Sequence, residues 1–140
     1  MFKIIEKDLT KESTIRTPAY AKYYALVNNI DDINYCLEFL KRNKLKVKIL
    51  GNGSNILFSK SYYDNILFIK LGKGFKNITF SKNFVEIGGS YSMIQAGRTL
   101  INMGYESFIF FNLIPATIGG AIRQNAGIGI NEEIKDVCIS

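Results

Sequence analysis

The stretch Gly51-Asn52-Gly53-Ser54-Asn55 directly follows the alternating run Lys46-Val47-Lys48-Ile49-Leu50. The alternation predicts a strand over 46–50 that delivers the chain into the glycine loop. Glycine lacks a Cβ, so such a turn can adopt left-handed dihedrals and lets a ligand approach the main chain closely. Successive main-chain amides in a turn of this kind form a concave anion site, and Ser54 and Asn55 add side-chain donors. The loop therefore suits a pyrophosphate, with a plain tight turn as the alternative interpretation.

Two other phosphate-binding loops do not match this stretch. The Rossmann fingerprint needs a third glycine and a helix after the loop, whereas we expect Ile56-Leu57-Phe58 to continue as a strand. A Walker loop needs the sequence GK[ST], which the chain lacks. We therefore expect the loop to be neither a Rossmann nor a Walker phosphate-binding loop.

The residues before and after the loop predict a strand-helix-strand unit. Residues 21–27 are rich in β-formers, and Asn29 is a candidate N-cap with Asp31 and Asp32 in the first helical turn. Apolar residues then recur at helical spacing as far as about Asn43, namely Ile33, Cys36, Leu37 and Leu40. Residues 66–69 form a further apolar strand. Such a unit favours a small parallel sheet.

The second half of the chain has a different character. Residues 77–80 and 84–87 predict a hairpin, and a helix is expected from about Ser92 to Met103, ended by Gly104. We place a boundary near residues 71–74. The aromatic run 107–111 is expected to be core, and residues 135–140 are expected to begin a strand.

A second glycine-bearing segment, NLIPATIGGAIRQNAG, spans 112–127. We expect a helical turn to begin near Thr117, with its free amides pointing outward and carrying a partial positive charge of about half a unit. Gly119, Gly120 and Ala121 would let a flat ring or a phosphate lie against the main chain. The alternative is a glycine-rich helix packed tightly on a sheet.

Composition excludes several classes of protein. The 140 residues are 47% hydrophobic and carry a net charge of +6. They contain no histidine, and this absence excludes Ser-His and Cys-His catalysis and a flavin linked through histidine. Cys36 and Cys138 form no CxxC pattern, so we expect two buried thiols in a reducing compartment and no metal site. The charged N-terminus indicates no signal peptide, and the longest uncharged stretch, 107–122, is too short for a membrane span. We expect a cytoplasmic protein without membrane partners.

The basic residues between 41 and 48 could form a nucleic-acid patch or the solvated end of a helix and strand. The cluster comprises Lys41, Arg42, Lys44, Lys46 and Lys48. Cations at a helix C-terminus complement its dipole, and no aromatic residue interrupts the cluster to provide a stacking platform. We therefore expect no nucleic-acid partner.

Taken together, these segments resemble the signature of the UDP-N-acetylenolpyruvoylglucosamine reductase family, also called UDP-N-acetylmuramate dehydrogenases. Residues 51–57 are similar to its first motif, G-x-G-S-N. Residues 113–121 and 124–127 are similar to its second motif, I-P-G-T-x-G-G-A…N-A-G. Ser13-Thr14-Ile15-Arg16 resembles the family's N-T-F-R/G stretch, and Gly104-Tyr105-Glu106 resembles its approach to the second motif.

The resemblance implies an α+β fold: two small lobes of the PCMH-type FAD-binding fold with FAD held between them, truncated before the substrate domain. Lobe 1 would span 1–72 with the glycine loop 51–55, and lobe 2, incomplete, would span 73–140 with a flavin loop at 112–129. Gly51 to Asn55 would hold the pyrophosphate, and Ile114 to Gly127 would line the flavin, ribityl and adenosine side. The candidate cofactor-binding residues are Gly51, Asn52, Gly53, Ser54, Asn55, Ile114, Pro115, Thr117, Gly119, Gly120, Ala121, Gln124, Asn125 and Gly127.

The implied activity is that of a flavoprotein oxidoreductase in peptidoglycan synthesis. NADPH reduces the FAD, which reduces the enolpyruvyl double bond of a UDP-sugar substrate. The family's proton-donating serine and substrate-binding residues would lie beyond Ser140, so we expect no catalytic residue here and no activity of these 140 residues alone. The alternative is a non-enzymatic FAD-binding module that needs a partner chain.

Three departures from the family pattern bear on the site. Ala116 stands where the family has glycine, at a position that could require a positive φ. Residues 127–131 lack the family's tyrosine. Arg123 could pair with a phosphate or with Glu132. We also expect exposed apolar surface near Val137 and Ile139.

Overall fold

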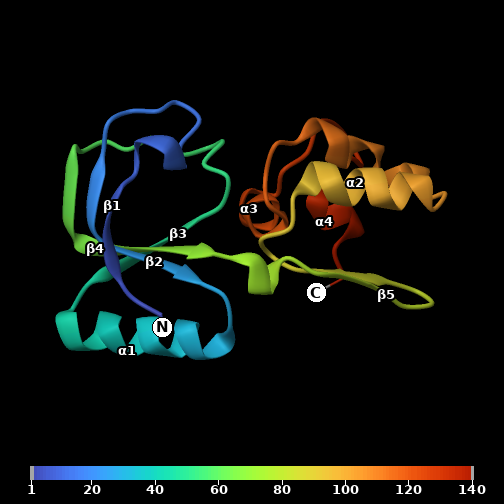
Figure 1. The fold of residues 1–140 in the computed structure, drawn as a ribbon. Helices are drawn as coiled ribbons and strands as arrows, with labels where there is room; N and C mark the ends of the chain where they lie inside the picture. The colour runs from blue at the N-terminus through green and yellow to red at the C-terminus, as the bar shows by residue number, and fades with distance from the viewer. Residues whose placement is uncertain (1, 140) are drawn as a thin grey trace. The chain divides into compact units, whose positions relative to one another are not determined.

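The computed structural model describes residues 2–139 and divides the chain into two compact units, one ending at Phe75 and one beginning at Lys76. Both units combine helices with a β-sheet (Figure 1). The α+β class expected from the sequence is confirmed. The division lies just beyond the 71–74 boundary that the sequence suggested.

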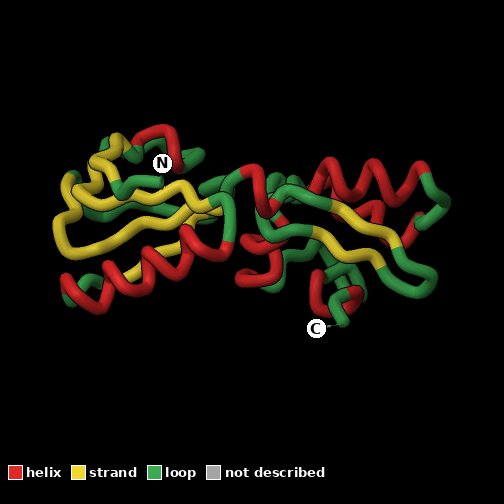
Figure 2. The backbone as a smooth tube through the Cα atoms, turned by 60° about the horizontal axis from the view of Figure 1, so that its bottom comes forward, coloured by secondary structure: helices red, strands yellow, loops and turns green. Residues whose placement is uncertain are grey.

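Unit 1, residues up to Phe75, is built on a four-stranded sheet of order β1-β2-β4-β3. The strands are β1 (Ile5–Asp8), β2 (Tyr20–Val27), β3 (Lys46–Leu50) and β4 (Tyr62–Leu71). β2 and β3 both pair in parallel with β4, while β1 pairs antiparallel with β2 at the edge. Figure 2 draws the strands in yellow and the helices in red. The predicted parallel sheet is therefore confirmed, and β1 was not anticipated.

Helix α1 (Ile30–Asn43) covers one face of this sheet. The side chain of Asn29 accepts a hydrogen bond from the amide of Asp32 at 2.9 Å, which confirms the predicted cap. Cys36 is fully buried in the cluster that α1 forms with β2 and β4. Leu37, by contrast, is 48% exposed, so the buried side of α1 does not include it.

The opposite face of the sheet is covered by the chain segments before β2 and after β3. Phe58, Tyr63 and Phe68 pack edge to face, with ring centroids 5.3 to 6.1 Å apart. The prediction that 56–58 continue as a strand is wrong, because these residues pair with no strand. Phe58 instead inserts its ring into the core while Leu57 stays exposed.

Unit 2, from Lys76, contains the hairpin β5 (Ile78–Phe80) and β6 (Val85–Ile87), followed by helices (Figure 1). The helices are α2 (Met93–Asn102), the 3-10 helix η3 (Glu106–Leu113), α3 (Ile118–Gln124) and α4 (Ile134–Val137). Unit 1 also contains short 3-10 turns at Thr10–Glu12 (η1) and Lys73–Phe75 (η2). The hairpin and the second helix are as predicted.

Local signals explain where α2 begins and ends. The Ser92 hydroxyl accepts a hydrogen bond from the amide of Gln95 at 3.4 Å, and Gly104 has a φ of +90°. The core of unit 2 gathers Met93, Ala96, Leu100, Phe110, Phe111, Ala116, Ile118, Ala121 and Ile134. Phe110 and Phe111 confirm the aromatic run as core, although Ile109 within it is 59% exposed.

Two expectations about the C-terminal residues are wrong. Residues 134–137 form helix α4 where a strand was expected, because the Asp136 carboxylate accepts a hydrogen bond from the Glu133 amide and starts a helical turn. Ser140, the last residue of that expected strand, lies outside the described residues. Cys138 is exposed, unlike the buried Cys36. The exposed Ile139 agrees with the predicted apolar surface, whereas Val137 is half-buried against the core of unit 2.

Candidate cofactor-binding site

The glycine loop lies at the edge of unit 1 where ligands of parallel sheets bind. Because β2, β3 and β4 run in the same direction, their carboxyl ends at Val27, Leu50 and Leu71 meet at one edge of the sheet. Open sheets with parallel strands bind ligands beyond this edge. Residues 51–55 continue directly from β3, so the fold places the predicted loop at this edge.

Gly53 is required by the conformation of the loop. Its φ is +73°, and a Cβ at this position would lie 1.9 Å from the carbonyl oxygen of Glu12. The left-handed dihedral disfavours other residues, and the close approach leaves no space for a Cβ. The loop is therefore seated on the main chain of the segment around Glu12.

The segment that supports the loop is Ser13–Thr14. The Thr14 amide and hydroxyl both donate to the Gly53 carbonyl, at 3.1 and 3.4 Å. The Ser13 hydroxyl donates to the Ile56 carbonyl at 2.7 Å and accepts from the Ile15 amide at 3.2 Å. Residues 13–16 were expected only to resemble a family motif, and no residue among them was predicted to belong to the site.

In the glycine loop, Asn52 and Ser54 lie at the surface, and Gly53 between them is buried. Among residues 2–139, the amides of Asn52, Gly53 and Ser54 donate to no protein acceptor, and Asn52 and Ser54 are exposed. Amides left in this way form the donors of an anion-binding concavity. This half of the predicted site fits a diphosphate.

An ion-pair cluster ties the supporting segment to the sheet. The Glu12 carboxylate, only 11% exposed, lies 2.5 Å from the Lys70 ammonium on β4 and 3.8 Å from that of Lys7 on β1. Burial, and then the nearby Glu12 charge, raise the pKa of Tyr24 on β2 to about 12. The Glu12 side chain thus connects the supporting segment Ser13–Thr14 to β1 and β4.

In unit 2, the start of α3 does not offer the free amides that the sequence suggested. Thr117 caps the helix, its hydroxyl accepting from the Gly120 amide at 3.2 Å. The Ile118 amide donates to the Tyr91 carbonyl and the Gly119 amide to the Gly89 carbonyl, both at 2.9 Å. All three amides at the start of α3 are therefore occupied within the unit. The expectation of outward-pointing amides is wrong, because carbonyls of residues 89 and 91 accept from two of these amides and the Thr117 hydroxyl accepts from the third.

The glycine pair of α3 does offer a surface. A Cβ on Gly120 would meet only the Thr117 hydroxyl, at 3.1 Å, and open space otherwise. A Cβ on Gly119 would come within 3.1 Å of the Gly89 carbonyl, so Gly119 faces the unit's own main chain. Ala121 is buried in the core. Of these three candidates, Gly120 is the one at which a Cβ would meet no residue outside α3 and its cap.

Several candidates in unit 2 serve its own structure. Asn125 has a φ of +46°, and its carboxamide donates to the Glu133 carboxylate at 3.0 Å and accepts from the Lys135 amide at 3.1 Å. A Cβ on Gly127 would lie 2.6 Å from the Glu132 carbonyl. Both residues hold the turn between α3 and α4. Gln124 is exposed at the end of α3.

The segment before α3 is held by α2. The Ala116 carbonyl accepts from the Met93 amide at 2.9 Å, and the Ile114 carbonyl accepts from the Ala116 amide at 2.8 Å. Ala116 is absent from the residues with positive φ, so its Cβ causes no strain. Pro115 is exposed beside it. Arg123 is also exposed, and within residues 2–139 it forms no ion pair with Glu132.

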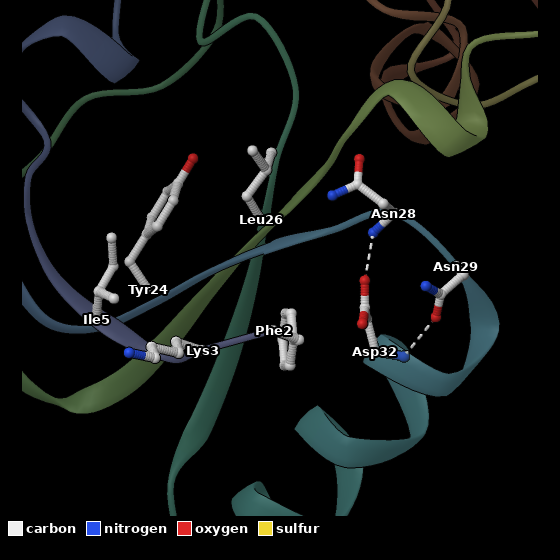
Figure 3. Close-up of a pocket in the computed structure, with 8 residues that line it drawn as sticks. All are labelled: Phe2, Lys3, Ile5, Tyr24, Leu26, Asn28, Asn29 and Asp32. Carbon is white, nitrogen blue, oxygen red and sulfur yellow. Dashed lines mark hydrogen bonds between the residues drawn. The ribbon is translucent and has the colours of Figure 1, made fainter.

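Unit 1 also has an open pocket of about 480 Å³ beside β1 and the start of α1 (Figure 3). Its lining residues are Phe2, Lys3, Ile5, Tyr24, Leu26, Asn28, Asn29 and Asp32. The Asp32 carboxylate there accepts a hydrogen bond from the Asn28 amide (Figure 3). None of the predicted site residues lines this pocket.

Comparison with known families decides the class of the chain. Residues 21–140 match a family model described as an FAD binding domain. The chain belongs to the FAD binding domain family. FAD is therefore the cofactor of this family.

The following two relatives have the same name. This domain is 39% identical to UDP-N-acetylenolpyruvoylglucosamine reductase of Pelagibacter ubique, over 95% of the chain and 43% of the relative. It is 31% identical to the protein of the same name from Francisella tularensis, over 85% of the chain and 41% of the relative. The chain thus spans about two fifths of the length of these relatives.

A solved structure supports the fold. The crystal structure of UDP-N-acetylenolpyruvylglucosamine reductase from Thermus caldophilus matches with a TM-score of 0.75 and 23% identity, over 97% of this chain and 47% of that one. In the described part of the FAD binding domain, no helix is long and apolar enough to cross a membrane. No group of three or more acidic, histidine or cysteine side chains there could hold a metal ion.

Proposed function

We propose that this chain binds FAD and that the loop Gly51–Asn55 holds its diphosphate. The proposal depends on the geometry of the loop. Three of its main-chain amides have no protein acceptor, and it lies at the carboxyl edge of parallel strands. Its Gly53 has a φ of +73°. Amide groups compensate diphosphate charge without a lysine or a metal ion. Ser54 adds a hydroxyl donor next to them.

In unit 2 we propose that the residues that contact the cofactor lie around Gly120. Its open side can accept a flat ring at van der Waals distance, as Thr117 and Ile118 hold the helix start in place. Ile114, Pro115 and Gln124 remain candidates for contact through their side chains. Gly119, Ala121, Asn125 and Gly127 would act by shaping this surface from within the unit.

We further propose that the chain is the FAD-binding part of a cytoplasmic UDP-N-acetylenolpyruvoylglucosamine reductase that serves peptidoglycan precursor synthesis. The shared name of the relatives and the two motifs support this assignment. Bound FAD supplies hydride transfer from NADPH to an enolpyruvyl double bond. The residues of this chain bind the cofactor and orient it.

The first experiment measures flavin binding by the purified chain. We expect quenching of FAD fluorescence on titration and a yellow protein after gel filtration. ADP, which carries the diphosphate without the flavin, should compete with FAD. A folded chain that neither quenches FAD nor retains colour would overturn the proposal.

The second experiment measures NADPH oxidation in the presence of UDP-N-acetylglucosamine enolpyruvate. We expect no substrate-dependent oxidation by these 140 residues alone, and oxidation when the chain is extended to the full length of its relatives. Flavin binding without activity in the extended protein would favour a non-enzymatic FAD-binding module.

A further inference from the structure

The carbonyl of Gly53 in the glycine loop and that of Ile56 directly after it both accept hydrogen bonds from residues distant in sequence. Thr14 reaches Gly53 across 39 residues, and Ser13 reaches Ile56 across 43 residues. Both carbonyls therefore point toward the segment 13–14. Ser13 is only 3% exposed, and its hydroxyl is used both as donor and as acceptor, which fixes its rotamer.

The direction of a carbonyl sets the direction of the next amide. The described peptide bonds of the chain are all trans, and in a trans peptide the C=O and the N–H that follows it point in opposite directions. Because the Gly53 carbonyl points toward Thr14, the Ser54 amide points away from it. The exposed side of Ser54 is the side on which a ligand can approach.

The segment is itself anchored, so it can serve as a fixed support. The nearly buried Glu12 carboxylate pairs with Lys70 of β4 and Lys7 of β1. The Glu12 carbonyl lies where a Cβ on Gly53 would be, so the loop cannot move closer to the segment. The loop therefore has one seated conformation, defined by the sheet through Glu12 and Ser13.

We propose that Ser13 is a positioning residue for the cofactor diphosphate. It makes no contact with the ligand; its hydroxyl ties the segment 13–14 to the Ile56 carbonyl directly after the loop, which keeps Thr14 on the Gly53 carbonyl and the Ser54 amide facing away from that segment. This inference rests on the proposed binding of FAD. It assigns a specific function to a residue outside both glycine segments. A cofactor fragment without phosphate should be indifferent to Ser13.

The test compares wild type, Ser13→Ala and Ser13→Thr, which keeps the hydroxyl. FAD binding is measured by fluorescence quenching, ADP binding by competition, and riboflavin binding as the phosphate-free probe. Ser13→Ala should weaken FAD and ADP binding by about tenfold, which corresponds to 1.4 kcal/mol, and leave riboflavin binding unchanged. Ser13→Thr should restore both affinities.

Two further variants control for loss of folding. Ser59→Ala removes the same hydroxyl from an exposed serine outside the loop and should match wild type. Thr14→Val, at an exposed position, removes one hydroxyl bond to Gly53 and should weaken ADP binding by about threefold even if Ser13→Ala does not fold.

Each outcome is decisive. If wild type binds FAD, and Ser13→Ala and Thr14→Val bind ADP as tightly as wild type does, the inference is overturned and the proposed function remains intact. Equal losses of ADP and riboflavin affinity in both variants would reduce Ser13 to a general structural residue and would also overturn the inference. Wild type that binds no FAD would overturn both.

Discussion

A Cβ built on Gly53 would lie 1.9 Å from the carbonyl oxygen of Glu12, so the main chains of these two residues are in direct contact. The glycine loop and the segment below it therefore form one packed structure. Substitutions at Gly53 should affect folding and ligand binding together.

Gly53→Ala should lower the free energy of unfolding by about 3 kcal/mol or more, because the left-handed φ costs 1–2 kcal/mol and the Glu12 main chain must also move. Thermal unfolding and FAD titration measure the two effects. Gly104→Ala is the matched control: its φ is also positive, but its Cβ meets nothing within 4 Å. Equal destabilisation in both variants would contradict a role for the Glu12 contact.

Asn125→Ala should destabilise unit 2 by about 2 kcal/mol, because the carboxamide bridges Glu133 and the Lys135 amide and a left-handed φ suits asparagine. Hydrogen exchange at residues 134–137 should become faster. Asn131→Gly is the control, since Asn131 also has a positive φ but an exposed side chain. Unchanged exchange in Asn125→Ala would show that α4 does not depend on this bridge.

Stability should fall at alkaline pH through Tyr24. Burial raises the pKa of Tyr24 to about 12 from an ordinary value of 10.0, so folding favours the neutral phenol. The contribution is complete below pH 10 and is lost as pH rises from there through about 12. Tyr24→Phe should therefore lose less stability than wild type between pH 9 and 11 in urea unfolding.

Tyr35→Phe, an exposed position on α1, serves as the control for that measurement and should follow wild type. If Tyr24→Phe and wild type lose stability in parallel, the hydroxyl of Tyr24 is already solvated in the folded protein.

The two cysteines should differ in reactivity. Burial raises the pKa of Cys36 to about 11, whereas Cys138 is exposed. Because the thiolate is the reacting form, iodoacetamide at pH 8 should alkylate Cys138 in the folded protein and Cys36 only after unfolding. Peptide mass spectrometry measures both sites. Modification of Cys36 in the native chain would show that α1 opens readily from the sheet.

Signals that depend on near neighbours in sequence were sufficient for most elements. Asn29, Ser92 and Thr117 each cap a helix by accepting from an amide three residues later, so the residue type alone indicates the helix start. Alternation and helical spacing predicted β2 to β4 and α1. The short range of these interactions is the reason that the sequence reveals them.

Contacts between distant residues were not predictable in the same way. The amides of α3 looked free because Tyr91 and Gly89, which accept from Ile118 and Gly119, are distant in the sequence. Residues 56–58 are as apolar as a strand, yet the Ile56 carbonyl is taken by Ser13. In both cases a hydrogen bond between residues distant in sequence occupies a main-chain group for which the local pattern predicted a different state.

The sequence by itself determined the family, the two glycine segments, the strand-helix-strand order of the first unit and the absence of histidine chemistry. These properties follow from residue identity and spacing along the chain. Only the tertiary structure decided which amides remain available, because a main-chain group is free or occupied according to what folds back onto it. Residues 13–14 close on the carbonyls of the first loop and leave its amides open, while residues 89–91 close on the amides of α3.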